Sequence, residues 1–194
     1  MSNQNSGLVA VWVAGGLLVA VGAYTMIPPP KATAPVQTIK DIMDSTVDPA
    51  GDFLFESIQD IADDKGVRRK QPTTDADWAA VRKRLMDLYD APTALTAPGR
   101  KAAGPDDRSA APGVENEPWE TQVLLDSQHP ILVQKAEALK QAAALGLKAA
   151  DARDVDGLFK AIVTIDHACE SCHLHFWYPR DKRAQAAARE EGVE

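Results

Sequence analysis

Apolar residues recur at intervals of three and four positions along most of the chain after residue 37, the spacing typical of one face of an α-helix. The pattern predicts four amphipathic helices, two of them covering about residues 38–65 and 74–97 and two beginning near residues 131 and 154. The first is expected to kink at Asp48-Pro49 and to stop at Gly66. No strand pattern is visible. The sequence therefore predicts an all-α fold, a four-helix bundle over residues 38–179.

The two ends of the chain differ from this helical part. Residues 1–27 contain no charged side chain, and residues 7–27 form an apolar run long enough to span a membrane as a helix. Because no Lys or Arg precedes the run, an uncleaved transmembrane anchor is favoured over a cleaved signal segment. Prolines make residues 28–37 a stiff linker, and residues 180–194 are expected to form a polar helical tail.

A segment rich in Pro, Gly, Ala and charged residues runs from Ala97 to Pro118, between the second and third helices. It predicts a long surface crossover, because neither side of it has enough apolar residues to close a core alone. A short helical piece around Trp119 and Leu124 follows, and His129-Pro130 is expected to end it.

Net charge narrows the range of partners. The chain has 28 acidic and 21 basic residues, which gives a formal net charge of -7. None of these residues lies within positions 1–27, so the excess negative charge belongs to the remainder of the chain. Nucleic acid is not an expected partner, because binding its phosphates needs a basic surface. Electrostatic steering favours a basic protein partner instead.

The chemistry of the chain centres on Cys169-Glu170-Ser171-Cys172-His173. This C-x-x-C-H run is the attachment signature of c-type haem, in which two thiols form thioethers with the porphyrin and the adjacent histidine ligates iron. On a helix, positions 169, 172 and 173 share one face. The chain has only these two cysteines, so no disulfide framework competes for them. The motif predicts one covalently bound haem c per chain.

Three other interpretations of the motif are open. A thioredoxin-like redox pair would stand at a helix start after a strand, yet no βαβ pattern surrounds these cysteines. A zinc site would use the thiols with His167, His173 and His175, although structural zinc sites usually draw ligands from two separated segments. The third interpretation is a chance occurrence of the motif without any ligand.

With this motif on its last predicted helix, the chain resembles the class II cytochromes c, the cytochrome c′ family, over about residues 36–180. The resemblance rests on the run from Ala168 to His173, and more loosely on Asp48-Pro49-Ala50, Trp78 and Pro98-Gly99-Arg100. It implies four helices, with haem on the last of them and His173 as the proximal ligand of the iron.

The resemblance also suggests a distal ligand. Low-spin members of the family use a methionine of the first helix, and Met43 stands at the matching position. The competing candidates are Met86 on the second helix and an open or apolar distal side. Met43 also fits as a core residue, because it shares a stripe with Ile39 and Val47. The expected haem-binding residues are therefore Cys169, Cys172, His173 and Met43, the last two as iron ligands.

Histidine and methionine ligation suits electron transfer, so the resemblance implies a monohaem electron carrier rather than an enzyme. A five-coordinate iron would instead bind or sense a small gas such as NO or CO. Haem attachment to this motif takes place outside the cytoplasm, which predicts a bacterial inner-membrane protein with its soluble domain in the periplasm. Cleavage within residues 1–27 would make it soluble there. Redox proteins are the expected partners, and homodimer formation is left open.

Overall fold

The computed structural model describes residues 36–64 and 66–193, and this part of the chain is mostly helical with one small sheet. The elements are α1 (Ile39–Ile42), η1 (Met43–Val47), α2 (Asp48–Ser57), β1 (Gln59–Asp63), β2 (Gly66–Lys70), α3 (Asp75–Leu95), α4 (Pro118–Ser127), α5 (His129–Ala152), α6 (Val155–Phe176) and α7 (Lys182–Glu191). The predicted anchor over residues 1–27 lies outside the described residues. Among the residues described, no helix is long and apolar enough to cross a membrane.

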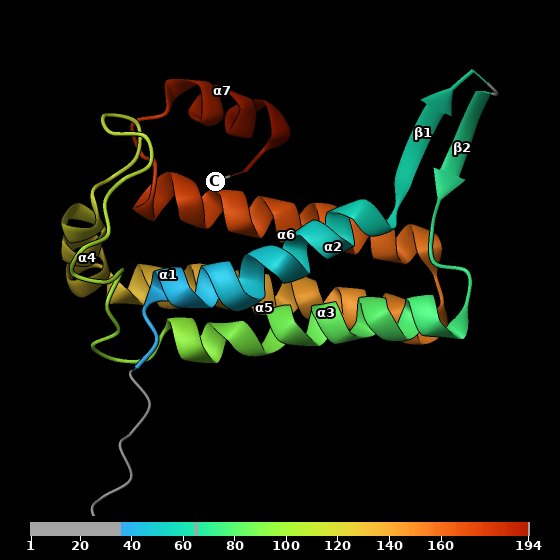
Figure 1. The fold of residues 1–194 in the computed structure, drawn as a ribbon, viewed down its shortest axis with the longest axis horizontal. Helices are drawn as coiled ribbons and strands as arrows, with labels where there is room; N and C mark the ends of the chain where they lie inside the picture. The colour runs from blue at the N-terminus through green and yellow to red at the C-terminus, as the bar shows by residue number, and fades with distance from the viewer. Residues whose placement is uncertain (1–35, 65, 194) are drawn as a thin grey trace, which may run out of the picture. The chain divides into compact units, whose positions relative to one another are not determined.

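Four helical stretches surround one apolar core. Figure 1 shows the stretch α1–η1–α2 and the helices α3, α5 and α6 running side by side. α2 packs on α3, α3 on α5, α5 on α6 and α6 on α2, so the contacts close a ring. The largest side chains that are completely buried are Val81, Leu54, Leu85, Leu88, Leu158 and Ile165, and they come from α2, α3 and α6. α4 and α7 pack against the outside of this ring.

The first helical stretch contains a π turn where the sequence predicts a kink. In η1 the backbone N–H of Asp48 donates to the carbonyl of Met43, five residues earlier. Pro49 follows and has no N–H to donate, so the regular series of α-helical backbone hydrogen bonds is interrupted at this point. The interruption takes the form of one wider turn, and the chain continues as α2.

The prediction that the first helix continues to residue 65 is wrong in its last part. α2 ends at Ser57, and β1 and β2 then form an antiparallel hairpin. At the start of β2, Gly66 has a φ of 111°, which glycine adopts at little cost. The strands are almost entirely exposed, and half of their residues are charged. Without a buried face they have no alternating apolar pattern, which is why the sequence did not indicate them.

Close packing between α3 and α5 depends on Gly146. A Cβ at this position would lie 2.5 Å from Cδ2 of Leu85, closer than two carbon atoms approach. Leu85 is fully buried and has little room to move. We expect Gly146→Ala to lower the free energy of unfolding by about 1–3 kcal/mol, despite the better helix propensity of alanine. Urea denaturation followed by circular dichroism measures this change.

The Leu85→Ala background provides the control for this prediction. Truncating Leu85 removes the atoms that the new Cβ would meet, so Gly146→Ala should then be neutral or stabilising. An equal loss of stability in both backgrounds would show that the contact with Leu85 is not the cause.

Candidate functional site

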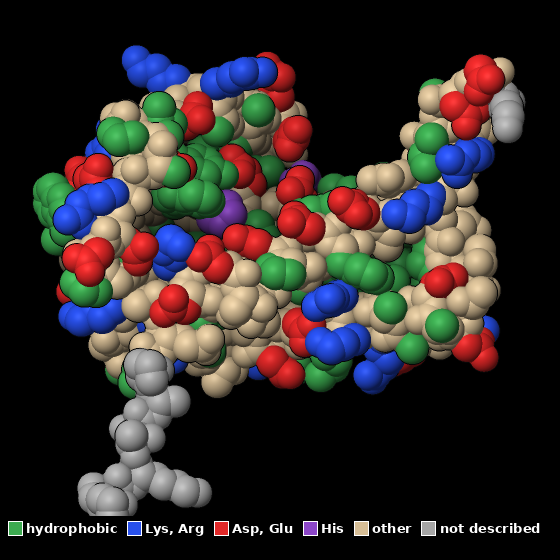
Figure 2. All heavy atoms as spheres, in the orientation of Figure 1, with side chains coloured by type: hydrophobic (Ala, Val, Ile, Leu, Met, Phe, Trp, Pro, Cys, Tyr) green, Lys and Arg blue, Asp and Glu red, His purple; other side chains and the backbone are tan. Residues whose placement is uncertain are grey.

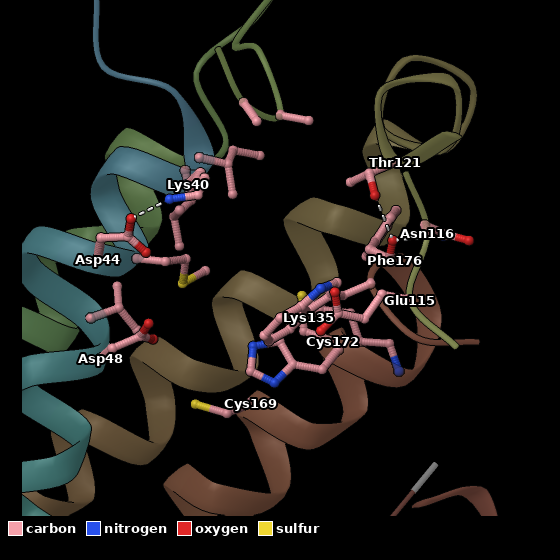
Figure 3. A pocket seen from close by; sticks show the side chains of 18 of the residues that line it. Lys40, Asp44, Asp48, Glu115, Asn116, Thr121, Lys135, Cys169, Cys172 and Phe176 are labelled. Carbon is pink, nitrogen blue, oxygen red and sulfur yellow. Dashed lines mark hydrogen bonds and ion pairs between the residues drawn. The ribbon is translucent and has the colours of Figure 1, made fainter. Parts of the chain in front are cut away.

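A cavity of about 460 Å³ lies between the first helical stretch and the C-terminal half of α6. Its lining is mostly apolar, and its volume is in the range of small-molecule and cofactor sites. Cys169, Cys172 and His173 line it from α6, and Met43 lines it from the first helical stretch. Figure 3 shows Asp44 and Asp48 on one wall of the cavity and Cys169 on the other. The structure thus brings all four predicted site residues to one cavity.

The π turn affects which residues of the first helical stretch face the cavity. The residues at four-position intervals all line it, namely Ile39, Met43, Val47, Gly51 and Phe55. In a regular α-helix such a row rotates by about 40° at each step. The wider turn in η1 offsets part of that rotation. Met43, at the first residue of the π turn, therefore shares one face with residues before and after it.

The two cysteines are half-buried, and their thiols keep their protons at neutral pH. Burial raises the pKa of Cys169 to about 12 and that of Cys172 to about 11. Cys169 packs against the main core, whereas Cys172 packs against a smaller apolar cluster that includes Leu132 and Phe176. Reactive redox cysteines have lowered pKa values. Here burial raises the pKa of both thiols, and at Cys172 it outweighs the lowering effect of Lys135. The geometry therefore disfavours a thioredoxin-like pair.

His173 is held in its neutral form. Burial lowers its pKa, and this effect outweighs the nearby carboxylates of Glu170, Asp48 and Asp166, which raise it. The ring contacts two aromatic rings beyond the end of α6, at centroid distances of 5.0 Å for Trp177 and 5.6 Å for Tyr178. A neutral imidazole is the form that binds a metal ion.

Two polar side chains lie behind the imidazole. The Tyr178 Oη lies 3.3 Å from Nδ1 of His173, and the same hydroxyl donates to Oε2 of Glu170 at 2.5 Å. The pKa of Tyr178 is raised because the phenol is partly desolvated and hydrogen-bonded to the Glu170 carboxylate. Tyr178 therefore keeps its proton at neutral pH.

The crossover before α4 forms part of the cavity wall, which no sequence pattern indicated. Asn116 is the buried polar residue of the described core, and its Nδ2 donates to the carbonyl of Phe176 at 3.0 Å. The backbone N–H of Asn116 donates to the carbonyl of Trp177 at 2.6 Å, and Thr121 Oγ1 also donates to the Phe176 carbonyl. Figure 3 shows Asn116 and Thr121 directed toward Phe176. These bonds fix the segment that follows the C-x-x-C-H motif.

The remaining candidates from the sequence lie elsewhere. Met86 is half-buried and does not line the cavity. His167 lies 3.9 Å from Glu191 of α7, and the Nε2 of His175 pairs with Gln128 at 2.6 Å. Neither histidine lines the cavity with His173. Within the described ranges, no group of three or more His, Cys, Asp or Glu side chains is arranged to hold a metal ion.

The residues at the cavity fit a covalently attached haem. Two uncombined thiols stand one helical turn apart, next to a neutral histidine, and the space in front of them is apolar. Met43 supplies a thioether sulfur, a ligand type found opposite histidine in cytochromes c. Comparison with protein-family profiles, with curated proteins and with solved structures finds no match to this chain. The assignment of the cavity therefore depends on its own chemistry.

Carboxylates are concentrated on the exposed side of this cavity. Asp44, Asp48 and Asp52 line it from the first helical stretch, and Asp166 lines it from α6; all four are exposed. In Figure 2 acidic side chains lie around a visible histidine on this face of the molecule. Partial desolvation at the cavity, together with the neighbouring Asp44 and Asp52, raises the pKa of Asp48 despite the opposing influence of His173.

Proposed function

We propose that this chain is a monohaem c-type cytochrome that carries single electrons, and that its four main helical stretches form the bundle of the class II cytochromes c. One observation carries the proposal: Cys169, Cys172, His173 and Met43 line a single apolar cavity, although Met43 is far from the others in sequence. Protein interiors are close-packed, so core packing of Met43 alone does not explain an apolar cavity of about 460 Å³ beside it. A bound ligand does.

Each of the four residues has a distinct role in this proposal. Cys169 and Cys172 would hold the haem through two thioethers, and His173 would be the proximal iron ligand. Bound haem supplies a one-electron Fe(III)/Fe(II) couple. Met43 would be the distal ligand, and its position among half-buried residues packed on the core limits its movement. A rigidly held ligand pair suits electron transfer, because little rearranges between the two oxidation states.

The partners in this proposal are redox proteins with a basic docking surface. The exposed carboxylates of Asp44, Asp48, Asp52 and Asp166 beside the cavity support it, because opposite charge accelerates encounter and orients the partner. We further propose that residues 1–27 anchor the protein in the bacterial inner membrane, with the helical domain in the periplasm. Both the uncharged composition of that segment and the extracytoplasmic attachment of haem to C-x-x-C-H support this location.

Carbon monoxide distinguishes an electron carrier from a gas-binding protein. CO needs an open position on ferrous iron, so the reduced protein should keep its low-spin optical spectrum when CO is added. A haemochrome spectrum in alkaline pyridine, recorded on the same sample, confirms that haem c is present. Rapid formation of a CO adduct would contradict methionine ligation and support the alternative, a five-coordinate protein that binds or senses NO or CO.

A further inference from the structure

Tyr178 links the histidine of the motif to a carboxylate. Its Oη lies 2.5 Å from Oε2 of Glu170 and 3.3 Å from Nδ1 of His173. A carboxylate only accepts hydrogen bonds, so the phenolic proton belongs to the bond with Glu170. The phenol oxygen is then available to accept a hydrogen bond from Nδ1–H of His173.

The directions of these two bonds determine the tautomer of His173. A proton on Nδ1 leaves the lone pair on Nε2, which is the nitrogen that remains for ligation. Metal-ligating histidines usually donate their second N–H to a carboxylate, a carbonyl or water, and this partner fixes the ring and increases its basicity. Here the Tyr178 phenol accepts this hydrogen bond, and the Glu170 carboxylate in turn accepts one from the phenol.

The two hydrogen bonds are held in place by α6 and by the turn that follows it. Glu170 precedes His173 by three residues on α6, so the two side chains share a face of the helix. Tyr178 lies beyond the helix end, where its backbone N–H donates to the His173 carbonyl at 2.9 Å. The hydrogen bonds from Asn116 to the carbonyls of Phe176 and Trp177 hold the intervening residues in place.

We propose that Tyr178 and Glu170 are positioning residues for the proximal ligand: they hold the His173 ring in the tautomer that ligates through Nε2 and strengthen it as an electron donor to iron. This inference rests on the proposed function. A stronger donor stabilises Fe(III) more than Fe(II), so the Tyr178–Glu170 pair lowers the reduction potential of the haem.

Tyr178→Phe tests the inference most cleanly, because it removes the hydroxyl without changing charge and keeps the ring that packs on His173. The reduction potential of the purified haem-loaded protein should rise. We expect a three- to tenfold increase in the ratio of reduced to oxidised protein at a fixed ambient potential, and tenfold corresponds to about 59 mV for one electron. Tyr89→Phe is the matched control, because Tyr89 lies on α3 outside the cavity lining.

Glu170→Gln and the double variant separate a hydrogen-bonded chain from a simple charge effect. Removing a negative charge near the haem raises the potential by itself, so the single Glu170→Gln shift is not decisive. If Glu170 acts through Tyr178, the double variant, Tyr178→Phe with Glu170→Gln, should shift the reduction potential by clearly less than the sum of the two single shifts. Glu137→Gln on α5, outside the cavity lining, controls for the loss of one carboxylate elsewhere.

Two results would overturn the inference while haem remains covalently bound. One is a Tyr178→Phe potential equal to that of Tyr89→Phe, and the other is strict additivity in the double variant. Haem content, measured as the pyridine haemochrome of each variant, separates these results from failure of the proposed function. If the native protein itself carries no haem, the proposed function is wrong and the inference falls with it.

Discussion

In the proposed cytochrome, replacing Met43 with alanine should leave haem attached but open the distal side of the iron. The reduced protein should change from a low-spin to a high-spin spectrum and acquire CO binding, because a ligand is lost without loss of the thioethers. The reduction potential should fall on the order of 100 mV, since methionine raises the potential of haem relative to weaker distal ligands. Optical titration with CO and a redox titration measure both effects.

Met86→Ala is the matched control for this experiment. Met86 is also half-buried and also on a helix of the ring, but it does not line the cavity. Its replacement should leave spin state, CO binding and potential unchanged. If Met43→Ala retains a low-spin spectrum that ignores CO, Met43 is core packing alone and another group ligates the iron.

Replacing both Cys169 and Cys172 with serine should abolish covalent attachment. Serine keeps the size of the side chain but cannot form a thioether, so any haem that binds would be extracted by acidified organic solvent. Each single variant should retain haem through one thioether, at reduced yield. Haem staining of a denaturing gel measures the attached fraction, because only covalently bound haem migrates with the polypeptide.

Ser171→Ala is the control within the motif. Ser171 is one of its two variable positions and is not among the residues that line the cavity. Haem staining of this variant should match that of the native protein. Equal staining of the double serine variant and the native protein would exclude thioether formation at these cysteines.

The helices after residue 70 could be predicted from the sequence because their signals are local. Thr74 caps α3 by accepting a hydrogen bond from the backbone N–H of Asp77, and Asp154 caps α6 in the same way through Gly157. In both helices, apolar side chains follow the cap at intervals of three and four positions. The hairpin β1–β2 could not be predicted, because its strands bury no face.

In the candidate site, too, the residues placed by local sequence could be predicted, and those placed by tertiary packing could not. The spacing of Cys169, Cys172 and His173 is local, so one helix is enough to place them together. The position of Met43 opposite them depends on how the first helical stretch packs, and only the resemblance to a known family indicated it. The contacts of Tyr178 with His173 and Glu170 depend on the turn after α6, so no local pattern indicated them. Asn116 had no sequence signal as a site residue, because its position depends on a long irregular segment.

The intact mass of the mature protein tests the central claim most directly. Covalent haem c adds about 616 Da to the polypeptide, because thiols add to the haem vinyl groups without loss of atoms. Electrospray mass spectrometry under denaturing conditions should show this increment on protein produced in the periplasm of a host that matures c-type cytochromes. A mass equal to that of the bare polypeptide, from the same host in which a control cytochrome c is loaded, would contradict the account.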